Sequence, residues 1–501
     1  MRNAGSSTKD GLAWFFILGC WGWLHCAAAA YGEALSPQRP NVLMIIVDDL
    51  NDWVGCLGGH PGVQTPHLDR LAKRGVLFTN AHVPSPVCNP SRVAVLTGRM
   101  PATSGVYDNK PIWHEWMPHV PSIPSHFKAS GYQVYGGGKV NHHMPGFNRR
   151  SDWHEYFDQR FDGAYQDELS RGQDVSGFQW TDGFPLNGLA SVKALTQPPK
   201  NPREFDWGPL GTSDDETGDG QMIRWAEALL SHPLKQPFFM AAGIYRPHLP
   251  MYAPEAYFKG YPTENIALPA IKADDLEDVP PAGKAMAAHR ADDFKLVVES
   301  GKYRELLQAY MASVSFADAM VGRLLDALDA GSAAHNTIVI LWSDHGWHLG
   351  EKNRLHKMTL WERSTRIPMV LAAPGWTEAG GRCDRAVGAI DLFPTLIQLC
   401  DLPELSLLDG QSLVPLLKDP AQSWARPALT TYGQGNHAVR SDRYRFIHYA
   451  NGDEELYDHH VDPHEWHNLA ADSWSDPIKE QLRAWLPKHD AKPLKQRKPD
   501  L

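Results

Sequence analysis

The sequence is poor in cysteine, has no long basic run and shows no internal repeat. Six cysteines occur in 501 residues. Those beyond the N-terminal segment are too few and too scattered for a disulfide scaffold and lack zinc-ligand spacing: Cys56, Cys88, Cys383 and Cys400. The formal net charge is -10. Because phosphate binding needs clustered Lys and Arg, we do not expect nucleic acid as a partner, and an anionic substrate would need local positive charge.

Two of these cysteines leave an alternative open. Cys383 and Cys400 can pair in an oxidising compartment. Cys400 also ends an apolar, helix-like run, which is equally compatible with a buried thiol in the core.

The N-terminus has the pattern of a secretory signal peptide over residues 1–30. Arg2 and Lys9 flank the start of an apolar, tryptophan-rich stretch, and residues 28–30 supply an A-x-A cleavage pattern. We therefore expect a secreted or periplasmic protein with no stable membrane span after cleavage. An uncleaved anchor helix is the alternative, although the apolar run is short for crossing a bilayer. A lipoprotein cleavage site at Leu18-Gly19-Cys20 is a second and weaker alternative.

Short apolar runs alternate with helical patterns along the chain. Residues 41–47, 237–245 and 337–342 are continuous apolar runs, typical of strands that are buried on both faces of a parallel sheet. Thr65-Pro66 can cap and open a helix after the first run. A long apolar pattern at helical spacing precedes the third. The sequence predicts an α/β fold, a large mixed but mostly parallel sheet sandwiched by helices.

Polar residues follow each of these three runs directly. They are Asp48 and Asp49, then Arg246 and His248, and finally Asp344 and His345. In doubly wound sheets, ligands gather beyond the carboxyl ends of the strands. Carboxylates at that place suit a hard divalent cation such as calcium, although neighbouring Asp residues at a strand end are commonly turn residues or helix caps.

The chain beyond the signal peptide divides into a large and a small domain. The full sequence has 501 residues, of which 43% are hydrophobic, and this is enough for a large core. We place a catalytic domain at residues 39–420, in which residues 148–217 form long loops around a substrate pocket. Strand-like segments and a closing helix near residues 478–486 predict a smaller α+β domain at residues 421–490. Residues 491–501 form a basic tail that we expect to fray.

The most informative motif is Cys88-Asn89-Pro90-Ser91-Arg92, followed by Thr97-Gly98-Arg99. It resembles the C-x-P-S-R plus T-G-R signature of type I sulfatases, a family of the alkaline phosphatase superfamily. From about residue 39 to residue 471 the chain is similar to this family, and most of all to its iduronate-2-sulfatase branch. Further segments carry the resemblance: residues 41–50, 138–142, 245–250, 343–347 and 350–352. It implies an alkaline phosphatase-like fold and a sulfuric ester hydrolase for a sulfated saccharide, in polysaccharide degradation.

The resemblance also implies two cofactors. Cys88 would be oxidised to formylglycine by a formylglycine-generating or anaerobic sulfatase-maturing enzyme, and the hydrate of this aldehyde would attack sulfur. A calcium ion would be bound by Asp48, Asp49, the modified Cys88, Asp344 and His345. Because calcium prefers oxygen ligands, an alternative role of His345 is to orient Asp344.

Hydrolysis of a sulfate ester also needs positive charge for the sulfuryl oxygens and an acid for the departing alkoxide. The resemblance assigns these tasks to Arg92, Lys139, His142, His248 and Lys357. Arg92 and Lys139 would hold the oxygens on sulfur, and His248, with Lys357, would protonate the leaving sugar oxygen. The ordinary alternative for each is a solvated side chain, and for Arg92 a helix-surface charge. His143 is then expected in the pocket wall.

The choice of substrate depends on Arg246, which occupies a position where the iduronate branch has lysine. Arg246, His248 and Lys357 are the predicted substrate-binding residues, and a guanidinium can bind a uronic-acid carboxylate bidentately. Two other functions stay open, a phosphoester or phosphonate hydrolase of the same superfamily and a catalytically silent carbohydrate-binding homologue with unmodified Cys88. A single evident metal cluster favours sulfate over a two-metal phosphatase.

Overall fold

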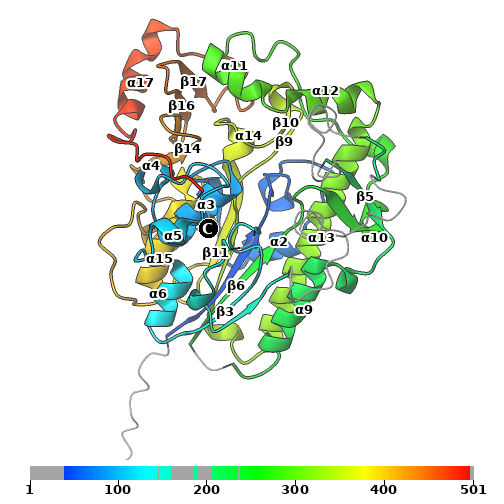
Figure 1. The fold of residues 1–501 in the computed structure, drawn as a ribbon, viewed down its shortest axis with the longest axis vertical. Helices are drawn as coiled ribbons and strands as arrows, with labels where there is room; N and C mark the ends of the chain where they lie inside the picture. Colours follow the sequence, from blue (N-terminus) through cyan, green and yellow to red (C-terminus); the bar gives the residue numbers. More distant parts are fainter. Residues whose placement is uncertain (1–38, 145, 160–185, 190–204, 235–236, 497–501) are drawn as a thin grey trace, which may run out of the picture. The chain divides into compact units, whose positions relative to one another are not determined.

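A mixed sheet forms the centre of the protein in its computed structural model, which describes residues 39–144, 146–159, 186–189, 205–234 and 237–496. Within these residues the sheet has nine strands in the order β12-β2-β11-β8-β1-β6-β3-β4, with β13 also paired to β2 (Figure 1). Its strands are β1 (Asn41–Val47), β2 (Val76–His82), β3 (Gln133–Gly138), β4 (Glu155–Phe157), β6 (Phe238–Ile244), β8 (Thr337–Ser343), β11 (Arg366–Ala372), β12 (Gly381–Cys383) and β13 (Val387–Gly388).

Strand direction is uniform in this sheet except for β11. β11 pairs antiparallel with both β2 and β8, whereas the other neighbouring pairs are parallel. The prediction of a mixed, mostly parallel sheet is therefore confirmed. β1 lies between β6 and β8, so the carboxyl ends of these three strands meet at one edge of the sheet.

Helices cover both faces of the sheet, which explains why β1 is apolar from Val42 to Val47. Leu43, Ile45 and Val47 belong to one apolar core, and Met44 and Ile46 belong to the other. The first core contains α2 (Pro66–Ala72), α9 (Gly218–Leu230) and α13 (Tyr303–Ala330), and the second contains α3 (Cys88–Thr97), α6 (Ile123–Ala129), α15 (Leu392–Leu399) and α16 (Val414–Lys418). Figure 1 shows α9 and α13 on one side of the strands and α6 and α15 on the other.

The C-terminal part contains a separate antiparallel sheet in the order β14-β15-β16-β17. Its elements are β14 (Ala428–Thr431), β15 (His437–Arg440), β16 (Tyr444–His448), β17 (Glu454–Asp458) and the covering helix α17 (Asp476–Arg483). Leu482 of α17 shares an apolar cluster with Phe446 and Leu456 of the sheet. The described residues from Pro40 onward form one compact unit, so a domain boundary at residue 421 stays a prediction.

Smaller elements surround the main sheet. They are the paired strands β5 (Trp207–Leu210) and β7 (Met251–Pro254), the paired strands β9 (His348–Leu349) and β10 (Leu355–His356), and the helices α4 (Pro101–Ser104), α5 (Trp113–Trp116), α10 (Glu255–Phe258), α11 (Pro281–Ala288), α12 (Ala291–Glu299) and α14 (Glu362–Thr365). Among the described residues, no helix combines the length and the apolarity that a membrane crossing requires.

Two local predictions differ from the structure. Thr65 precedes α2, but its side chain does not cap the helix, because Thr65 Oγ1 accepts a hydrogen bond from Gly55 N instead (2.8 Å). Cys383 is a free, buried thiol, so the alternative of a disulfide with Cys400 is not realised.

The predicted basic tail is docked rather than frayed over its first residues. Ala491 N donates to Ala102 O (2.7 Å), and Leu494 N donates to Gly105 O (2.8 Å). The predictions that fall wholly or partly outside the described residues are the signal peptide at residues 1–30, the loops at residues 148–217 and the end of the tail at residues 497–501.

Candidate active site

The acidic residues that follow β1 and β8 meet at the carboxyl edge of the sheet. Val47 pairs with Ser343, so Asp48 and Asp49 leave β1 beside Asp344, and Asp49 N donates to Asp344 Oδ1 (3.1 Å). Asp49 turns the chain with a φ of 58°, in the left-handed region that Asp tolerates better than most residues. All three carboxylates are fully buried, and buried charges require partners.

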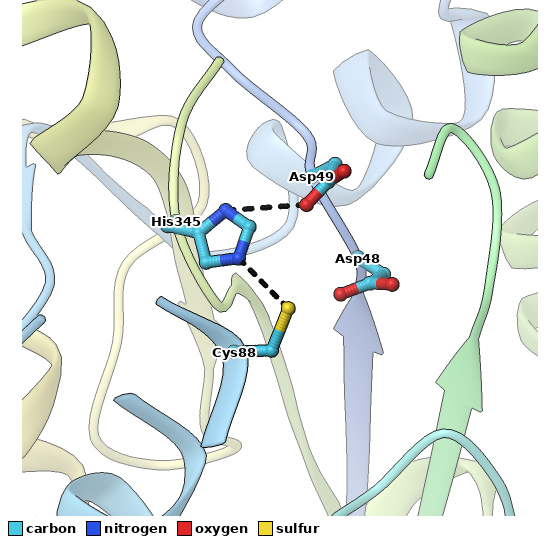
Figure 2. A group of neighbouring side chains, drawn as sticks. All are labelled: Asp48, Asp49, Cys88 and His345. Atoms are coloured by element: carbon cyan, nitrogen blue, oxygen red, sulfur yellow. Dashed lines mark hydrogen bonds and ion pairs between the residues drawn. The ribbon is translucent and has the colours of Figure 1, made fainter. Parts of the chain in front are cut away.

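Cys88 begins α3 and faces these acids. Its Sγ lies 3.3 Å from His345 Nε2, 3.3 Å from Lys357 Nζ and 3.9 Å from Lys139 Nζ. Figure 2 shows the His345 ring between Cys88 and Asp49. Burial by itself raises the pKa of the Cys88 thiol, but the charges of Lys139, Lys357 and His345 hold that pKa well below its usual value. The surroundings of Cys88 therefore stabilise negative charge.

Four residues of this cluster can hold a metal ion. One ligand atom from each of Asp48, Asp49, Cys88 and His345 lies within 4.8 Å of the others. Two ligands on opposite sides of a calcium ion are about 5 Å apart, so the spacing suits an ion of that size. Asp49 Oδ2 is buried without a hydrogen-bond partner among the described residues, which leaves its lone pairs for a cation. This donor set fits a divalent metal.

Arg92 is fully buried and links the acids of the two strands. Its Nε donates to Asp344 Oδ2 (2.9 Å) and its Nη2 to Asp48 Oδ1 (2.9 Å), while Nη1 donates to the Lys139 carbonyl. The interpretation of Arg92 as a helix-surface charge is wrong. Asp344 Oδ2 also lies 3.5 Å from His345 Nε2. Asp344 lies beside the four possible metal ligands, and its own role as a ligand stays a prediction. Whether His345 binds the metal or orients Asp344 stays open as well.

Close backbone contact between the ends of β3 and β6 positions Lys139. Lys139 N donates to Gly243 O (2.8 Å), and a Cβ on Gly243 would lie 2.1 Å from the carbonyl carbon of Lys139. Gly138 has a φ of 71°, a conformation that favours glycine. These two glycines let the Lys139 ammonium reach Asp48, with which it forms an ion pair.

Lys139 and Lys357 neutralise the acids from inside the protein. Lys357 Nζ lies 2.5 Å from Asp49 Oδ1, and both lysines are buried, so their interpretation as solvated side chains is wrong. Burial by itself would raise the pKa of Asp48, but the charges of Lys139, His248 and Arg92 hold that pKa well below its usual value. The Asp48 carboxylate is therefore kept ionised, whereas burial raises the pKa of Asp344 to about 7 despite the charge of Arg92.

His142 and His248 complete the predicted set. His142 is buried, which lowers its pKa despite a hydrogen bond with Cys88, so it is not a solvated side chain either. His248 Nδ1 lies 2.5 Å from Leu249 O, and Nε2 lies 3.9 Å from Asp49 Oδ2. Because a carbonyl oxygen can only accept, Nδ1 carries a hydrogen, and Nε2 is the nitrogen available for proton exchange.

These groups border a cavity of about 490 Å³. The predicted site residues in its wall are Cys88, His142, His248 and Lys357, and His143 lines it as expected. Arg92 and Lys139 do not occur in the described part of the wall and act from behind it. A ligand in the cavity can therefore contact the side chain of Cys88.

Arg246 is also absent from the described wall. Its side chain is buried, its Nε donates to Tyr252 O (2.7 Å), and its guanidinium faces the rings of Tyr245 and Tyr252. The backbone N of Arg246 donates to Asp219 Oδ2 (3.0 Å). This position favours a structural role in the segment that carries His248, and it does not support the predicted contact with a substrate carboxylate.

The part of the wall that precedes α12 was not predicted from the sequence. His289 and Arg290 line the cavity there, together with His356 next to Lys357. Trp347, which also lines it, lies in a segment that carried the family resemblance and could have been found from it. Arg290 and His289 belong to no motif, and no signal in the sequence would have marked them.

Comparison with protein families decides the identity of the chain. A family model described as sulfatase matches residues 40–402. The protein belongs to the sulfatase family. A second model, described as N-sulphoglucosamine sulphohydrolase, C-terminal, matches residues 350–492 of the same sulfatase. The resemblance drawn from the Cys88 motif is thus confirmed.

Individual relatives agree with this assignment. A sulfatase of Formosa agariphila is 38% identical over 461 residues, covering 91% of this chain and 87% of that protein. Iduronate 2-sulfatase of Homo sapiens is 33% identical over 431 residues, covering 82% and 74%. The structure of a phosphonate monoester hydrolase from Silicibacter pomeroyi has a TM-score of 0.71 at 22% identity, covering 89% and 94%, which shows a shared fold. The chain is a sulfatase similar to iduronate 2-sulfatase.

Proposed function

We propose that this sulfatase removes sulfate from a sulfated saccharide, with a 2-O-sulfated uronic acid as the first candidate. The observation that carries the proposal is the position of Cys88, whose side chain borders the cavity with Sγ within 3.3 Å of His345 Nε2 and Lys357 Nζ. An ester bound against this atom meets buried positive charge, which stabilises developing negative charge. Similarity to human iduronate 2-sulfatase supports the choice of sugar, and the N-terminal pattern supports a secreted or periplasmic enzyme.

Two cofactors belong to the proposal, formylglycine at position 88 and a calcium ion. A formylglycine-generating or anaerobic sulfatase-maturing enzyme would act on Cys88, and the ion would be held by Asp48, Asp49, His345 and residue 88, with Asp344 beside them. Formylglycine supplies a hydrated aldehyde as nucleophile, and calcium supplies charge that favours its ionised form. The 4.8 Å spacing and the unpartnered Asp49 Oδ2 support this assignment.

The protein's own residues bind and orient the ester. Lys357, whose Nζ lies 3.3 Å from Sγ of residue 88, binds the sulfuryl oxygens as their charge grows, and Lys139 adds positive charge from behind the wall, with its Nζ 3.9 Å from Sγ. Arg92 uses its donors on Asp48 and Asp344 and so fixes the carboxylates rather than the substrate. His248 Nε2 donates a proton to the departing sugar oxygen, and His142 orients residue 88.

Mass spectrometry of the peptide that contains residue 88 is the first test. Protein from its natural host is expected to carry formylglycine and to release free sulfate from at least one member of a panel of defined sulfated saccharides that includes 2-O-sulfated uronic acids. Cys88→Ala, which cannot be oxidised to the aldehyde, is the matched inactive control. Recovery of unmodified cysteine alone would favour the silent carbohydrate-binding homologue.

A phosphoester or phosphonate hydrolase is the competing function. Its support is the shared fold with a phosphonate monoester hydrolase, together with the similar shape of sulfate and phosphoryl groups. Matched sulfate, phosphate and phosphonate esters of one leaving group separate the two functions. A kcat/KM about tenfold higher for the phosphorus ester would overturn the sulfatase proposal.

A further inference from the structure

The cavity wall contains a cationic side chain that the proposed mechanism does not use. Among the described residues of the wall, the lysine and arginine side chains are Lys357 and Arg290, and none is Asp or Glu. Lys357 forms an ion pair with Asp49 (2.5 Å), whereas Arg290 is half-buried at the wall. Two cations and an absence of acids at the surface of a small cavity favour a ligand with a second anionic group besides its sulfate.

The backbone holds Arg290 in an uncommon conformation. Its φ is 65°, in the left-handed region that a long side chain adopts rarely and at an energetic cost. It is the residue before α12, and its side chain makes no capping hydrogen bond to that helix. The left-handed turn at Arg290 separates α11 from α12 and so places the residue at the junction of the two helices.

Two contacts fix the junction of α11 and α12 to the hairpin that carries Lys357. On the α12 side, His356 Nε2 lies 2.9 Å from Asp293 Oδ2. On the α11 side, Arg354 Nη1 donates to Met286 O (2.8 Å).

Arg354 also donates from Nη2 to Lys357 O (2.7 Å), so one buried guanidinium joins α11 to the residue beside Cys88. Arg290 stands between these two attachments. The backbone at Arg290 is therefore fixed relative to Lys357, which contacts Sγ of Cys88 (3.3 Å). A guanidinium on such a fixed segment can bind a planar carboxylate bidentately with a smaller loss of freedom.

We infer that Arg290 binds the carboxylate of a sulfated uronic acid while the sulfate ester lies against residue 88, and that it thereby sets a preference for acidic over neutral sugars. The inference rests on the proposed function of the same site. It moves the predicted carboxylate contact from Arg246, which lies behind the wall, to a residue in the wall. A cavity of about 490 Å³ is of the size that small ligands occupy.

The test uses the mature enzyme and two sulfated sugars that differ only in a carboxylate or a hydroxymethyl group. Arg290→Gln is expected to lower kcat/KM for the acidic sugar about 10- to 100-fold, mainly through KM, because a charge-assisted hydrogen bond is lost. For the neutral sugar the change is expected to be less than about 2-fold. Arg290→Lys keeps the charge without the bidentate geometry and should recover part of the loss. Arg382→Gln, at an arginine whose side chain is 56% exposed on β12, is the matched control.

An equal loss for both sugars overturns the inference, because a merely structural residue would not distinguish them. An unchanged KM for the acidic sugar also overturns it. Wild-type enzyme that cleaves an aryl sulfate and the neutral sugar but rejects the acidic one refutes the inference and leaves the proposed function standing. Failure to release sulfate from every ester refutes the proposed function as well. If Arg290→Gln does not fold, competitive inhibition of the wild-type enzyme is the alternative test. The free uronic acid is expected to inhibit at lower concentration than its carboxyl-reduced analogue. Equal inhibition by the two compounds overturns the inference.

Discussion

Replacing Arg92 by methionine tests how the buried charges of the site are balanced. The change keeps an unbranched side chain of moderate length but removes the hydrogen bonds to Asp48 and Asp344, each 2.9 Å long. Asp48 keeps Lys139 as a partner. Asp344 keeps the imidazole of His345 at 3.5 Å. A carboxylate in the core would thus lose its guanidinium without gaining water.

The expected loss follows from the burial of all three side chains. Removing one partner of a buried ion pair costs about 3–5 kcal/mol of unfolding free energy. At an unfolding entropy of about 2.1 cal/mol/K per residue, a compact unit of this size would then melt roughly 3–5 °C lower. Sulfate release should be lost as well, because the carboxylates that surround residue 88 would no longer be held in place.

Thermal unfolding followed by circular dichroism in the presence of a chelator measures this loss, with all variants heated at one scan rate. Arg382→Met is the control and is expected to melt within about 1 °C of the wild type. The double variant Arg92→Met/Asp344→Asn should regain part of the stability, since it removes the carboxylate that lost its partner. If Arg92→Met melts at the temperature of the control, the guanidinium does not hold the two acids together and the reasoning fails.

The remaining predictions concern the ion, the proposed acid and the C-terminal sheet. Calcium at about 100 times its Kd should stabilise the metal-free protein by about 2.7 kcal/mol, which is measured as a higher melting temperature. The same increase in melting temperature in Asp49→Asn would contradict Asp49 as a calcium ligand. His248→Gln should lower kcat/KM about 10²- to 10⁴-fold for an alkyl sulfate but little for an aryl sulfate with a good leaving group, and equal losses would exclude it as the acid. Burial would raise the pKa of Glu362, but Arg440 and neighbouring cations hold that pKa well below its usual 4.5. Ionised Glu362 therefore stabilises the fold above pH 4.5, and this stabilisation is lost as the pH falls through the lowered pKa. In urea unfolding, Glu362→Gln should therefore have an unfolding free energy about 3–5 kcal/mol below that of the wild type at pH 7, and the two free energies should converge in acid. The same difference at every pH would contradict the ion pair between Glu362 and Arg440.

The strands that carry the site could be predicted from the sequence for a physical reason. A strand covered on both faces has no exposed position, so the run at residues 41–47 has no polar residue after Asn41 and coincides with β1. The run that ends at Trp342 coincides with β8 to within one residue. Acids that follow such runs lie at the carboxyl edge of the sheet, so the sequence predicts Asp48 and Asp344 at the same edge.

The direction of the polar side chains could not be predicted in the same way. Periodicity reports which face of an element is buried, but the direction of a side chain beyond a strand end depends on the local turn, as the φ of 58° at Asp49 illustrates. Arg246 lies two residues after the end of β6 and yet its side chain lies against Tyr252, behind the cavity. Arg290 faces the cavity from a junction between two short helices, where neither periodicity nor a motif marks it.

The burial of Cys88 has a consequence for its proposed oxidation to formylglycine. Its side chain is 1% exposed, so a second protein can reach the thiol only while that segment is still extended. His345, which closes over Cys88, lies 257 residues further along the chain. At 5–20 residues per second, roughly 10–50 s separate the synthesis of the two. The long sequence distance between the signature and its partners is therefore also an interval of time in which the proposed oxidation of Cys88 would take place, and folding would end that interval.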